Sequence, residues 1–574
     1  MPAANAEETQ TFIFIWLTHK IMEVYQRFRQ RLFKNNISMT STQKWIFALL
    51  LFMALAYFGV FALPNAVASQ NLSIVQMFQP DEAAPLPYIF QMIAPVSTLN
   101  LALRHFVFYD YYYYGFPYFA LSALVILPLQ WLGRLGDMPQ IMLLLRQIVS
   151  VLPMLVALLL LVYMQDGFRS YRSPVIFALL LSVPAVVQNN LWWHPDGITF
   201  LFVVLTLFFL KKDNLHFGWD FLIAAIFSGV ATAIKLVGVY FFLAVGLTLL
   251  LGVLLKKVSW KRLVGMAIAF LLVMGIAFVA ANPFLLSHWA RTAYGYIFNK
   301  QTWLLEEGYG VIYEKGLAAA WPLIHESFGE LAFIFIAIGA AIWGAWRGSQ
   351  RLMHALILAW LIPLSVVVFF LTHFKFQYWM PVALPLISSV AILLPEKLEK
   401  LRVTPSPRFS VIAYVSLRII ILVIVFAQFV LFVRSDVQRF NSDLHRADNN
   451  QRIQFYSVVE QKLAPLPEGP LSVYYDYRLY VPETSGWKLE TNYDLLEYGY
   501  IKENKFDVLL LLQQRILDYI NPDAIGIDPD LFALNQQFYN DAENGTINGY
   551  HLIYRDTLGL VFVRDDLYQQ YYSK

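Results

Sequence analysis

The chain has 574 residues, of which 58% are hydrophobic and 14% are charged, and its net charge is +3. Soluble domains carry about 25% charged residues, so this composition excludes an ordinary soluble protein and predicts a mainly α-helical, polytopic membrane protein. The sequence contains no cysteine, which excludes disulfides, thiol catalysis and cysteine-ligated metals. The small net charge gives no indication of a nucleic-acid partner, because in a membrane protein the placement of positive charge matters more than its sum.

Residues 1–44 are predicted to be a basic cytoplasmic tail. Six lysine and arginine residues lie between positions 20 and 44. No small-residue cleavage site follows a short apolar core, as it would in a secretory signal peptide. We therefore expect the first membrane span to stay in the mature chain.

Eleven apolar segments after the tail are predicted to cross the membrane. A spanning helix needs about 17 to 25 mostly apolar residues. Together the segments form a predicted transmembrane domain at 45–433, whose first outer loop, 64–139, is long. The predicted spans are 45–63, 140–164, 173–192, 197–210, 220–234, 236–254, 263–284, 329–346, 353–371, 379–394 and 410–433.

The segment GFPYFALSALVILPLQWLG, residues 115–133, is apolar enough to span the membrane but contains two prolines. Cytoplasmic loops are enriched in lysine and arginine. If this segment does not cross, five basic loops lie on the same side as the tail: QDGFRSYRSP, KKDN, KKVSWKR, RGSQR and PEKLEKLRVTPSPR. If it crosses, all five lie outside. We therefore predict eleven spans, with residues 115–133 as a juxtamembrane or re-entrant element.

This topology gathers the unusual polar residues on one extracytoplasmic face. They are PDE (80–82), WWHPDG (192–197), Lys235, the loop 285–328 and THFKFQYW (372–379). The residues from 434 to 574 are predicted to form a small α/β domain on the same side. Strand-like runs LSVYYDY and FDVLLLLQ, a helical stretch around NYDLLEYGYIKE, and a hairpin in YHLIYRDTLGLVFVRDD support that domain.

Two acidic motifs are the first candidates for chemistry. Asp81 and Glu82 follow the first span, and Asp81 is the candidate general base, because a carboxylate can accept the proton of an attacking hydroxyl. We expect one of the two acids to be catalytic and the other to support it. Asp196 and His194 lie in the second motif. A His and an Asp two residues apart are too few ligands for a closed metal site, so a divalent metal held by Asp81, Asp196 and His194 stays an open alternative.

Basic and aromatic residues on the same face are candidates for substrate binding. Lys235, at the end of a span, either holds a phosphate or extends its ammonium to the headgroup layer. Arg146 lies within a span, where a charge must be paired or face a cavity, so it either holds Asp81, holds a lipid phosphate or only braces the bundle. Lys375 and Tyr378 either bind a phosphate or belong to the aromatic belt at the interface. Tyr113, in the aromatic run FYDYYYYGFPYF, has a ring that either contacts a sugar or anchors the interface. The two tryptophans of WWHPDG are expected to be interface anchors.

These motifs together resemble the GT-C glycosyltransferases, a superfamily that includes protein O-mannosyltransferases, aminoarabinose transferases and lipid-linked mannosyltransferases. The resemblance covers residues 45–394. It is carried by the order of PDE, the proline-containing outer loop, LLRQIVSVL, HPDG, GVATAIK and KFQYWMPVALP. It implies the GT-C fold, with about eleven transmembrane helices and a small extracytoplasmic α/β domain.

The resemblance also implies an inverting transfer of a sugar from a polyprenyl-phosphate carrier to an acceptor hydroxyl. Asp81 would deprotonate or orient the acceptor, and Asp196 would support the site or a bound metal. Lys235, Arg146 and Lys375 would stabilise the departing lipid phosphate. The outer loop lacks the basic residue and paired prolines of the protein mannosyltransferases, so a lipid or glycan acceptor is favoured over a protein.

Two other classes of function remain alternatives. A transporter or flippase also places ionisable residues in membrane cavities, although no internal symmetry of two halves is visible here. A structural or assembly factor would leave the acids simply solvated. Gly-rich phosphate loops are absent from the sequence, which disfavours an ATP-driven pump. The expected location is a bacterial inner membrane, with the site facing outward.

Overall fold

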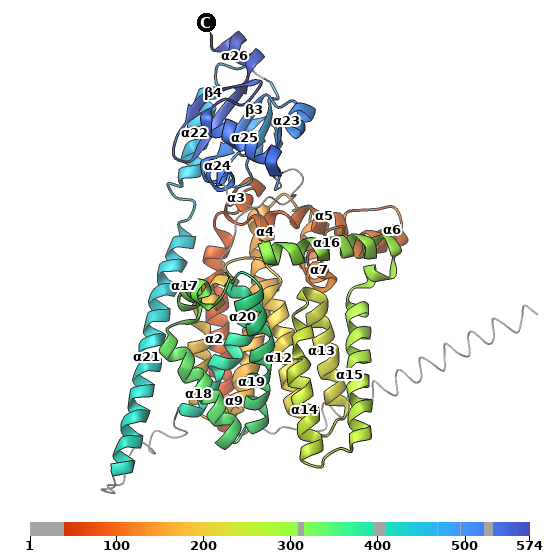
Figure 1. Ribbon diagram of the computed structural model, residues 1–574, viewed down its shortest axis with the longest axis vertical. Helices are drawn as coiled ribbons and strands as arrows, with labels where there is room; N and C mark the ends of the chain where they lie inside the picture. Colours follow the sequence, from red (N-terminus) through yellow and green to blue (C-terminus); the bar gives the residue numbers. More distant parts are fainter. Residues whose placement is uncertain are drawn as a thin grey trace, which may run out of the picture.

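The computed structural model describes residues 39–307, 315–394, 409–467, 469–493, 495–521 and 532–573. A helical bundle forms the larger part, and a small α/β domain lies beyond one of its ends (Figure 1). The basic tail before residue 39 and the predicted basic loop at 395–408 lie outside the described residues.

Each of the eleven predicted spans overlaps one helical segment of the bundle. The segments are α2 (Ser41–Ala66), α8, η1 and α9 (Met138–Asp166), α10 (Arg172–Leu181) with α11 (Pro184–Asn190), α12 (Asp196–Asp213), α13 (Trp219–Lys235), η2 with α14 (Val237–Leu254), α15 (Trp260–Ala281), α17 (Leu317–Phe328) with α18 (Leu331–Arg347), α19 with η4 (Arg351–Leu371), α20 with η5 (Phe376–Leu393), and α21 (Phe409–Leu444).

The bundle identifies the chain as an integral, multi-pass membrane protein. Within the described residues, seven helices are long and apolar enough to cross a membrane, or nine if each of two bent pairs counts as one span. The bent pairs are α10 with α11, at 63°, and α17 with α18, at 81°. Two further segments fall short because α13 has 17 residues and α12 carries charged residues at both ends. The number eleven therefore stays a prediction.

Helices of the outer connections form a layer across the end of the bundle that faces the α/β domain (Figure 1). They come from the first outer loop and from the connection after α15. Their bounds are α3 (Leu72–Phe78), α4 (Pro80–Ala83), α5 (Leu86–Ile93), α6 (Leu99–Val107), α7 (Phe116–Trp131), η3 (Pro283–Leu286) and α16 (His288–Glu307).

Helix α7 is the segment whose crossing of the membrane was in question. Its start is fixed at the ends of α13 and α15, because Gly115 N donates to Ile234 O at 3.1 Å and Phe116 N donates to Asn282 Oδ1 at 2.9 Å. The approach to α13 requires glycine, since a Cβ on Gly115 would lie 1.9 Å from Ala233 O. The short connection 132–137 then leads into α8. A helix that begins and ends beside the outer-loop helices fits the predicted juxtamembrane element.

One buried ion pair fastens the outer loop to the bundle. Arg146 and Glu82 are both fully buried, and Arg146 Nε donates to Glu82 Oε1 at 2.8 Å, while Nη2 donates to Oε2. Arg146 Nη1 also donates to the carbonyl of Asn65 at 2.9 Å, and the N–H of Trp193 donates to Glu82 Oε1 at 2.5 Å. The pair thus links α2, α4, the start of η1 and the segment before α12.

The basic loops meet at the opposite end of the bundle. Lys211 Nζ donates to Met164 O at 2.7 Å, and Arg172 donates to Leu394 O. A second depression at this end is lined by residues of the 211–215 and 348–353 loops. Since α12 runs from Asp196 to Asp213, the acidic motif and the basic loops lie at opposite ends of one helix, as the predicted topology requires.

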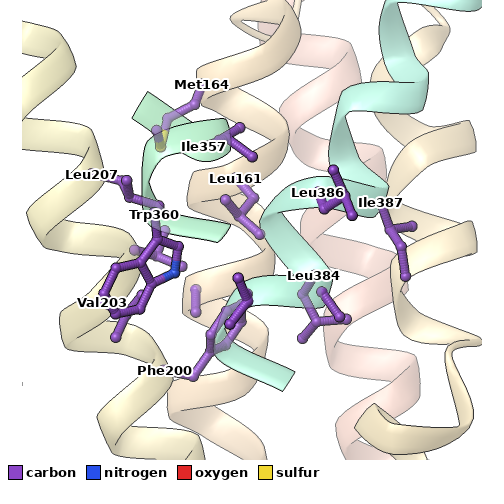
Figure 2. Packing of buried hydrophobic residues seen from close by; sticks show 14 of the residues in the cluster. Leu161, Met164, Phe200, Val203, Leu207, Ile357, Trp360, Leu384, Leu386 and Ile387 are labelled. Carbon is purple, nitrogen blue, oxygen red and sulfur yellow. The ribbon is translucent and has the colours of Figure 1, made fainter. Parts of the chain in front are cut away.

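The core of the bundle is apolar and closely packed. Figure 2 shows Trp360 of α19 between residues of α9, α12 and α20, among them Leu161, Val203 and Leu384. Trp360 is fully buried and its indole Nε1 donates to Pro381 O at 2.9 Å. Tight packing of this kind fixes the positions of the helix ends on which the polar residues lie.

The α/β domain contains one five-stranded sheet of order β2-β1-β3-β5-β4. Strands β2, β1 and β3 are parallel, whereas β5 pairs antiparallel with both β3 and β4. The predicted strands and hairpin are confirmed, and the short β2 was not predicted. The bounds are α22 (Gln451–Leu463), β1 (Ser472–Tyr475), β2 (Lys488–Glu490), α23 (Tyr498–Asn504), β3 (Val508–Leu512), α24 (Gln513–Ile520), α25 (Phe532–Asn544), β4 (Tyr550–Arg555), β5 (Gly559–Arg564) and α26 (Asp565–Tyr571).

Helix α21 connects the two parts. It has 36 residues, which at 1.5 Å per residue corresponds to about 54 Å, well beyond the roughly 30 Å of a bilayer core. It passes position 433, the predicted domain boundary, and ends at Leu444. Arg446 then donates to Val67 O and Ala68 O, and Arg452 to Met77 O at 2.7 Å. The base of the α/β domain is therefore bonded to the outer loop.

The Glu82–Arg146 pair predicts a large loss of stability when one partner is removed. Arg146→Met leaves the Glu82 carboxylate buried without its cation, which costs about 3–5 kcal/mol. We expect a clearly lower melting midpoint for the purified variant in detergent, measured by fluorescence-detected size-exclusion chromatography after heating.

The matched control is Arg134→Met. It breaks the 2.6 Å pair with Asp137, whose partners are 51% and 33% exposed, and such exposed pairs contribute at most about 1 kcal/mol. Equal losses in the two variants would show that burial of the Glu82–Arg146 pair has no special weight.

Candidate active site

A cavity of about 980 Å³ lies between the end of the bundle and the α/β domain. Its lining includes seven of the nine residues predicted for the site: Asp81, Tyr113, His194, Asp196, Lys235, Lys375 and Tyr378. These residues come from five separate stretches of the chain. The cavity is large enough for a drug-sized ligand or a disaccharide with a phosphate.

Asp196 is the centre of the polar cluster on the bundle side. It is the first residue of α12 and is 2% exposed. Its Oδ1 contacts Lys235 Nζ at 2.5 Å, and its Oδ2 contacts His194 Nδ1. Both carboxylate oxygens are thus engaged, so Asp196 orients the other two side chains rather than offering a free oxygen to a substrate.

Close backbone packing holds this cluster in place. Gly197 follows Asp196, and a Cβ at this position would lie 2.6 Å from Ser150 O of η1. The hydroxyl of Ser150 accepts from His194 N at 3.2 Å. The ring of Trp192 stacks on that of His194, with centroids 4.2 Å apart and an interplanar angle of 5°. The imidazole therefore has one fixed orientation.

Trp192 and Trp193 were predicted to be interface anchors, and this prediction was wrong. Trp193 is fully buried and Trp192 is 9% exposed. Trp193 Nε1 donates to Ser122 Oγ of α7 at 3.0 Å, and its ring stacks on Tyr118. The outer-loop helices cover the end of the bundle, so residues at the end of a span are packed against protein here.

Tyr114 belongs to the cluster and was not singled out from the sequence. Its hydroxyl lies 2.9 Å from His194 Nε2. Burial raises the pKa of Tyr114 well above its ordinary value, with Asp81 adding to the rise, so the hydroxyl stays protonated and can donate to Nε2. The two ring nitrogens of His194 thus contact Tyr114 on one side and Asp196 on the other. The aromatic run around 110–119 was the available signal, but it did not distinguish Tyr114 from its neighbours.

Two lysines approach the same aromatic ring. Lys235 Nζ lies 5.2 Å, and Lys375 Nζ lies 5.8 Å, from the centre of the Tyr378 ring. Burial lowers the pKa of Lys375, Asp81 opposes this, and the charge of Lys235 adds to the lowering. The two ammonium groups thus lie near one another on one wall, an arrangement that favours a bound anion.

Asp81 and Glu82 point in different directions, as expected for adjacent acids on a turn. Asp81 is exposed and lines the cavity, whereas Glu82 is fully buried with Arg146. Arg146, a candidate for contact with a lipid phosphate, has Nε, Nη1 and Nη2 bonded to Glu82 and to the carbonyl of Asn65. Neither Glu82 nor Arg146 lines the cavity in this structure. Glu82 and Arg146 therefore have a structural role. Because the Glu82 side chain points into the bundle, that of the adjacent Asp81 points into the cavity.

The bundle side of the cavity does not fit a divalent metal. Among the described residues, no group of three His, Asp or Glu side chains has the arrangement of a metal site. Asp196, one of the three candidate ligands, already contacts the ammonium of Lys235, and a second lysine lies close by. In a metal site, several carboxylates surround the cation. Here the positive charge beside Asp196 comes from lysine side chains instead.

The fold is similar to that of a solved membrane protein structure. The crystal structure of ArnT from Cupriavidus metallidurans bound to undecaprenyl phosphate matches with a TM-score of 0.51 and 14% identity, covering 91% of this chain and 98% of ArnT. The chain has the GT-C fold. This confirms the predicted fold class, and residues 116–373 also match Glycosyltransferase family 87. The matched residues include His194, Asp196 and Lys235, whereas Tyr114 lies two positions before the first of them.

Two further solved structures match the chain with lower scores. ArnT from Cupriavidus metallidurans in the apo state has a TM-score of 0.48 at 15% identity, covering 91% of this chain and 98% of ArnT. The oligosaccharyltransferase AglB from Archaeoglobus fulgidus, in complex with an inhibitory peptide and a dolichol-phosphate, has a TM-score of 0.47 at 11% identity, covering 86% of this chain and 72% of AglB. No curated protein sequence matches the chain.

The donor set predicts that the purified protein binds no divalent metal at Asp196. Mn²⁺ titrated into the full chain in nanodiscs, followed by electron paramagnetic resonance, is expected to show no stoichiometric site. One bound Mn²⁺ per chain that disappears in Asp196→Asn, but persists in the distant variant Asp137→Asn, would contradict this reading.

Proposed function

We propose that the chain transfers a sugar from a polyprenyl-phosphate donor to an acceptor hydroxyl, with inversion at the anomeric carbon. The observation that carries the proposal is the pairing, in one cavity, of an exposed carboxylate, Asp81, with two lysines, Lys235 and Lys375. The match to Glycosyltransferase family 87 supports glycosyl transfer. The fold shared with ArnT, solved with undecaprenyl phosphate, supports a lipid-phosphate donor.

The lysines suit the leaving group. As the bond between the anomeric carbon and the phosphate oxygen breaks, negative charge develops on the phosphate, and preorganised cations stabilise that charge. Lys235 is held by Asp196, which His194 and Tyr114 support in turn. In this proposal Asp196, His194 and Tyr114 position the cation, and polyprenyl phosphate leaves with the bonding electrons.

Asp81 suits the acceptor. Its carboxylate accepts the proton of the acceptor hydroxyl while the oxygen attacks the anomeric carbon. Asp196 is the other described carboxylate on the bundle side of the cavity, and both of its oxygens are engaged. A single free carboxylate supports a single displacement over a two-step mechanism through a glycosyl-enzyme, and a single displacement inverts the configuration.

The proposed location of this reaction is the extracytoplasmic face of a bacterial inner membrane. The basic loops lie at the end of the bundle opposite the cavity, and such loops stay in the cytoplasm. The sugar is a hexose or a pentose, and the acceptor is a lipid or a glycan, with a protein less favoured.

Replacement of Asp81 tests the base. Asp81→Asn keeps the size of the side chain but cannot take up a proton, so transfer should fall about 10²–10⁴-fold. The full chain is reconstituted with radiolabelled polyprenyl-phosphate hexoses and pentoses and a panel of lipid and glycan acceptors. Asp137→Asn is the control, because Asp137 is outside the cavity lining and asparagine also caps a helix.

Unchanged transfer by Asp81→Asn would remove Asp81 from the mechanism. Absence of transfer by the wild-type protein with every donor and acceptor would count against the glycosyltransferase proposal as a whole.

The lowered pKa of Lys375 predicts a pH dependence. Lys375 loses its proton at a lower pH than a solvated lysine does, and only the charged form attracts the donor phosphate. The value of kcat/KM should therefore decline on the alkaline side, earlier than a solvated lysine would require. In Lys375→Arg the decline should move to higher pH, since arginine keeps its charge. An identical alkaline profile for both proteins would show that Lys375 does not meet the phosphate.

A further inference from the structure

The side of the cavity formed by the α/β domain has no part in the mechanism proposed above. We call this side the roof. It is lined by residues that follow the three parallel strands: Tyr477 and Arg478 after β1, Asn492 and Tyr493 after β2, and Gln514, Arg515, Asp518 and Tyr519 on α24 after β3. Helix α24 lies at the edge of the domain nearest the bundle (Figure 1). The carboxyl ends of parallel strands are the usual place for ligands in α/β sheets.

A buried ion pair fixes the shape of the roof. Arg515 Nη1 lies 2.7 Å from Asp476 Oδ1, and the two side chains are 7% and 1% exposed. Asp476 Oδ2 accepts from Leu512 N at 2.7 Å. Arg515 also donates to the carbonyls of Asn492 at 3.4 Å and Tyr493 at 3.3 Å. One guanidinium thus ties together the ends of β1 and β3 and the segment after β2.

Two tyrosine rings are held side by side by this framework. The ring centres of Tyr477 and Tyr493 are 5.0 Å apart, at an angle of 39°. The guanidinium of Arg515 lies over the Tyr477 ring at 5.3 Å. Tyr493 remains 40% exposed, which leaves its ring open to the cavity.

The aromatic pair and the proposed base line the same cavity. Burial raises the pKa of Tyr493, and Asp81 contributes to that rise across the cavity. The Tyr493 hydroxyl therefore stays protonated within electrostatic reach of Asp81. A ligand resting on the two rings would present its polar groups to that carboxylate.

The remaining roof residues are polar. Gln514 Nε2 donates to Asp518 Oδ1 at 2.9 Å, so an amide and a carboxylate lie next to each other at the edge of the cavity. Among the described residues of the roof, Leu512 is the one aliphatic side chain. A lipid chain or an apolar peptide side chain would need a larger aliphatic surface, whereas sugar rings offer C–H faces to aromatic rings and hydroxyls to amides and carboxylates.

We propose that the roof is a saccharide-binding site in which Tyr477 and Tyr493 pack against a sugar ring and Gln514 and Asp518 hydrogen-bond its hydroxyls. The site deepens the proposed function by naming its acceptor class, and as an acceptor site it rests on that function. The acceptor is a glycan, either free or carried on a lipid, with the attacking hydroxyl turned toward Asp81. Arg515 is a positioning residue, because it lies over the Tyr477 ring and donates to the carbonyl of Tyr493.

Direct binding tests this site without turnover. The full chain in nanodiscs is mixed with trisaccharides of mannose, glucose and galactose, and saturation-transfer difference NMR detects the sugar C–H protons that contact the protein. The same trisaccharides on a short lipid tail form a second arm, which separates a free glycan from a lipid-borne one. A short hydroxyl-containing peptide is the competing probe.

The variants separate ring contact from folding. Tyr477→Ala with Tyr493→Ala should raise the Kd for the trisaccharide, obtained by titrating the sugar signal, about tenfold, which corresponds to about 1.4 kcal/mol, whereas Tyr477→Phe with Tyr493→Phe should leave the Kd nearly unchanged. Tyr571→Ala, on α26 at the far end of the domain (Figure 1), should leave it unchanged. In transfer assays the alanine variants should raise KM for the acceptor and leave KM for the donor unaltered.

Three results would overturn the proposal: no signal with any trisaccharide, a signal that the alanine variants retain in full, or binding by the peptide alone. Because the binding measurement requires no donor, a sugar signal in a chain that transfers nothing would keep the saccharide site and reject the glycosyltransferase. Sugar transfer by a chain whose roof binds no saccharide would support the glycosyltransferase and reject the saccharide site.

Discussion

The Glu82 carboxylate is the point from which the geometry of the site is set. It accepts from Arg146 of the second span and from the N–H of Trp193, and Arg146 in turn holds the end of α2 through Asn65. A charge can be buried at this depth only when it is paired and hydrogen-bonded. The requirement to satisfy one carboxylate therefore brings the outer loop, η1 and the start of α12 to fixed positions. With Glu82 turned inward, Asp81 is turned outward into the cavity.

As a result, the two acidic residues of the cavity's bundle side, Asp196 and Asp81, have different roles. Asp196, next to the segment that Glu82 holds, has both oxygens occupied and serves to orient His194 and Lys235. Asp81 has its carboxylate exposed to the cavity. Two acids with similar ordinary pKa values thus differ in role because one is enclosed by partners and the other is open. The α/β domain completes the cavity from above, so the site belongs to both parts of the chain.

The sequence predicted the fold class and the end of the bundle at which the candidate polar residues meet, because apolar length and charge asymmetry report directly on the membrane. Seven of nine candidate residues meet in one cavity, since the topology alone brings their helix ends to one face. The ion pair between Glu82 and Arg146 could not be predicted from the sequence, because it joins residues 64 positions apart and depends on the direction in which each side chain points. Tyr114 was hidden among similar tyrosines, and the burial of Trp193 depends on the packing of α7. The roof residues follow short strands, and their convergence needs the strand order, which hydrophobic pattern does not reveal.

The length of helix α21 determines how far the roof lies from the bundle and how the roof is rotated about the helix axis. It runs without a break from Phe409 to Leu444, and the residues that follow it are bonded to the outer loop through Arg446 and Arg452. In a continuous helix each added residue lifts whatever follows by 1.5 Å and turns it by about 100°. The tyrosine pair faces Asp81 only at one combination of lift and turn. Substitutions at exposed positions of α21 would therefore leave the roof in place, whereas the insertion or deletion of a single residue would both shift the roof along the helix axis and rotate it about that axis.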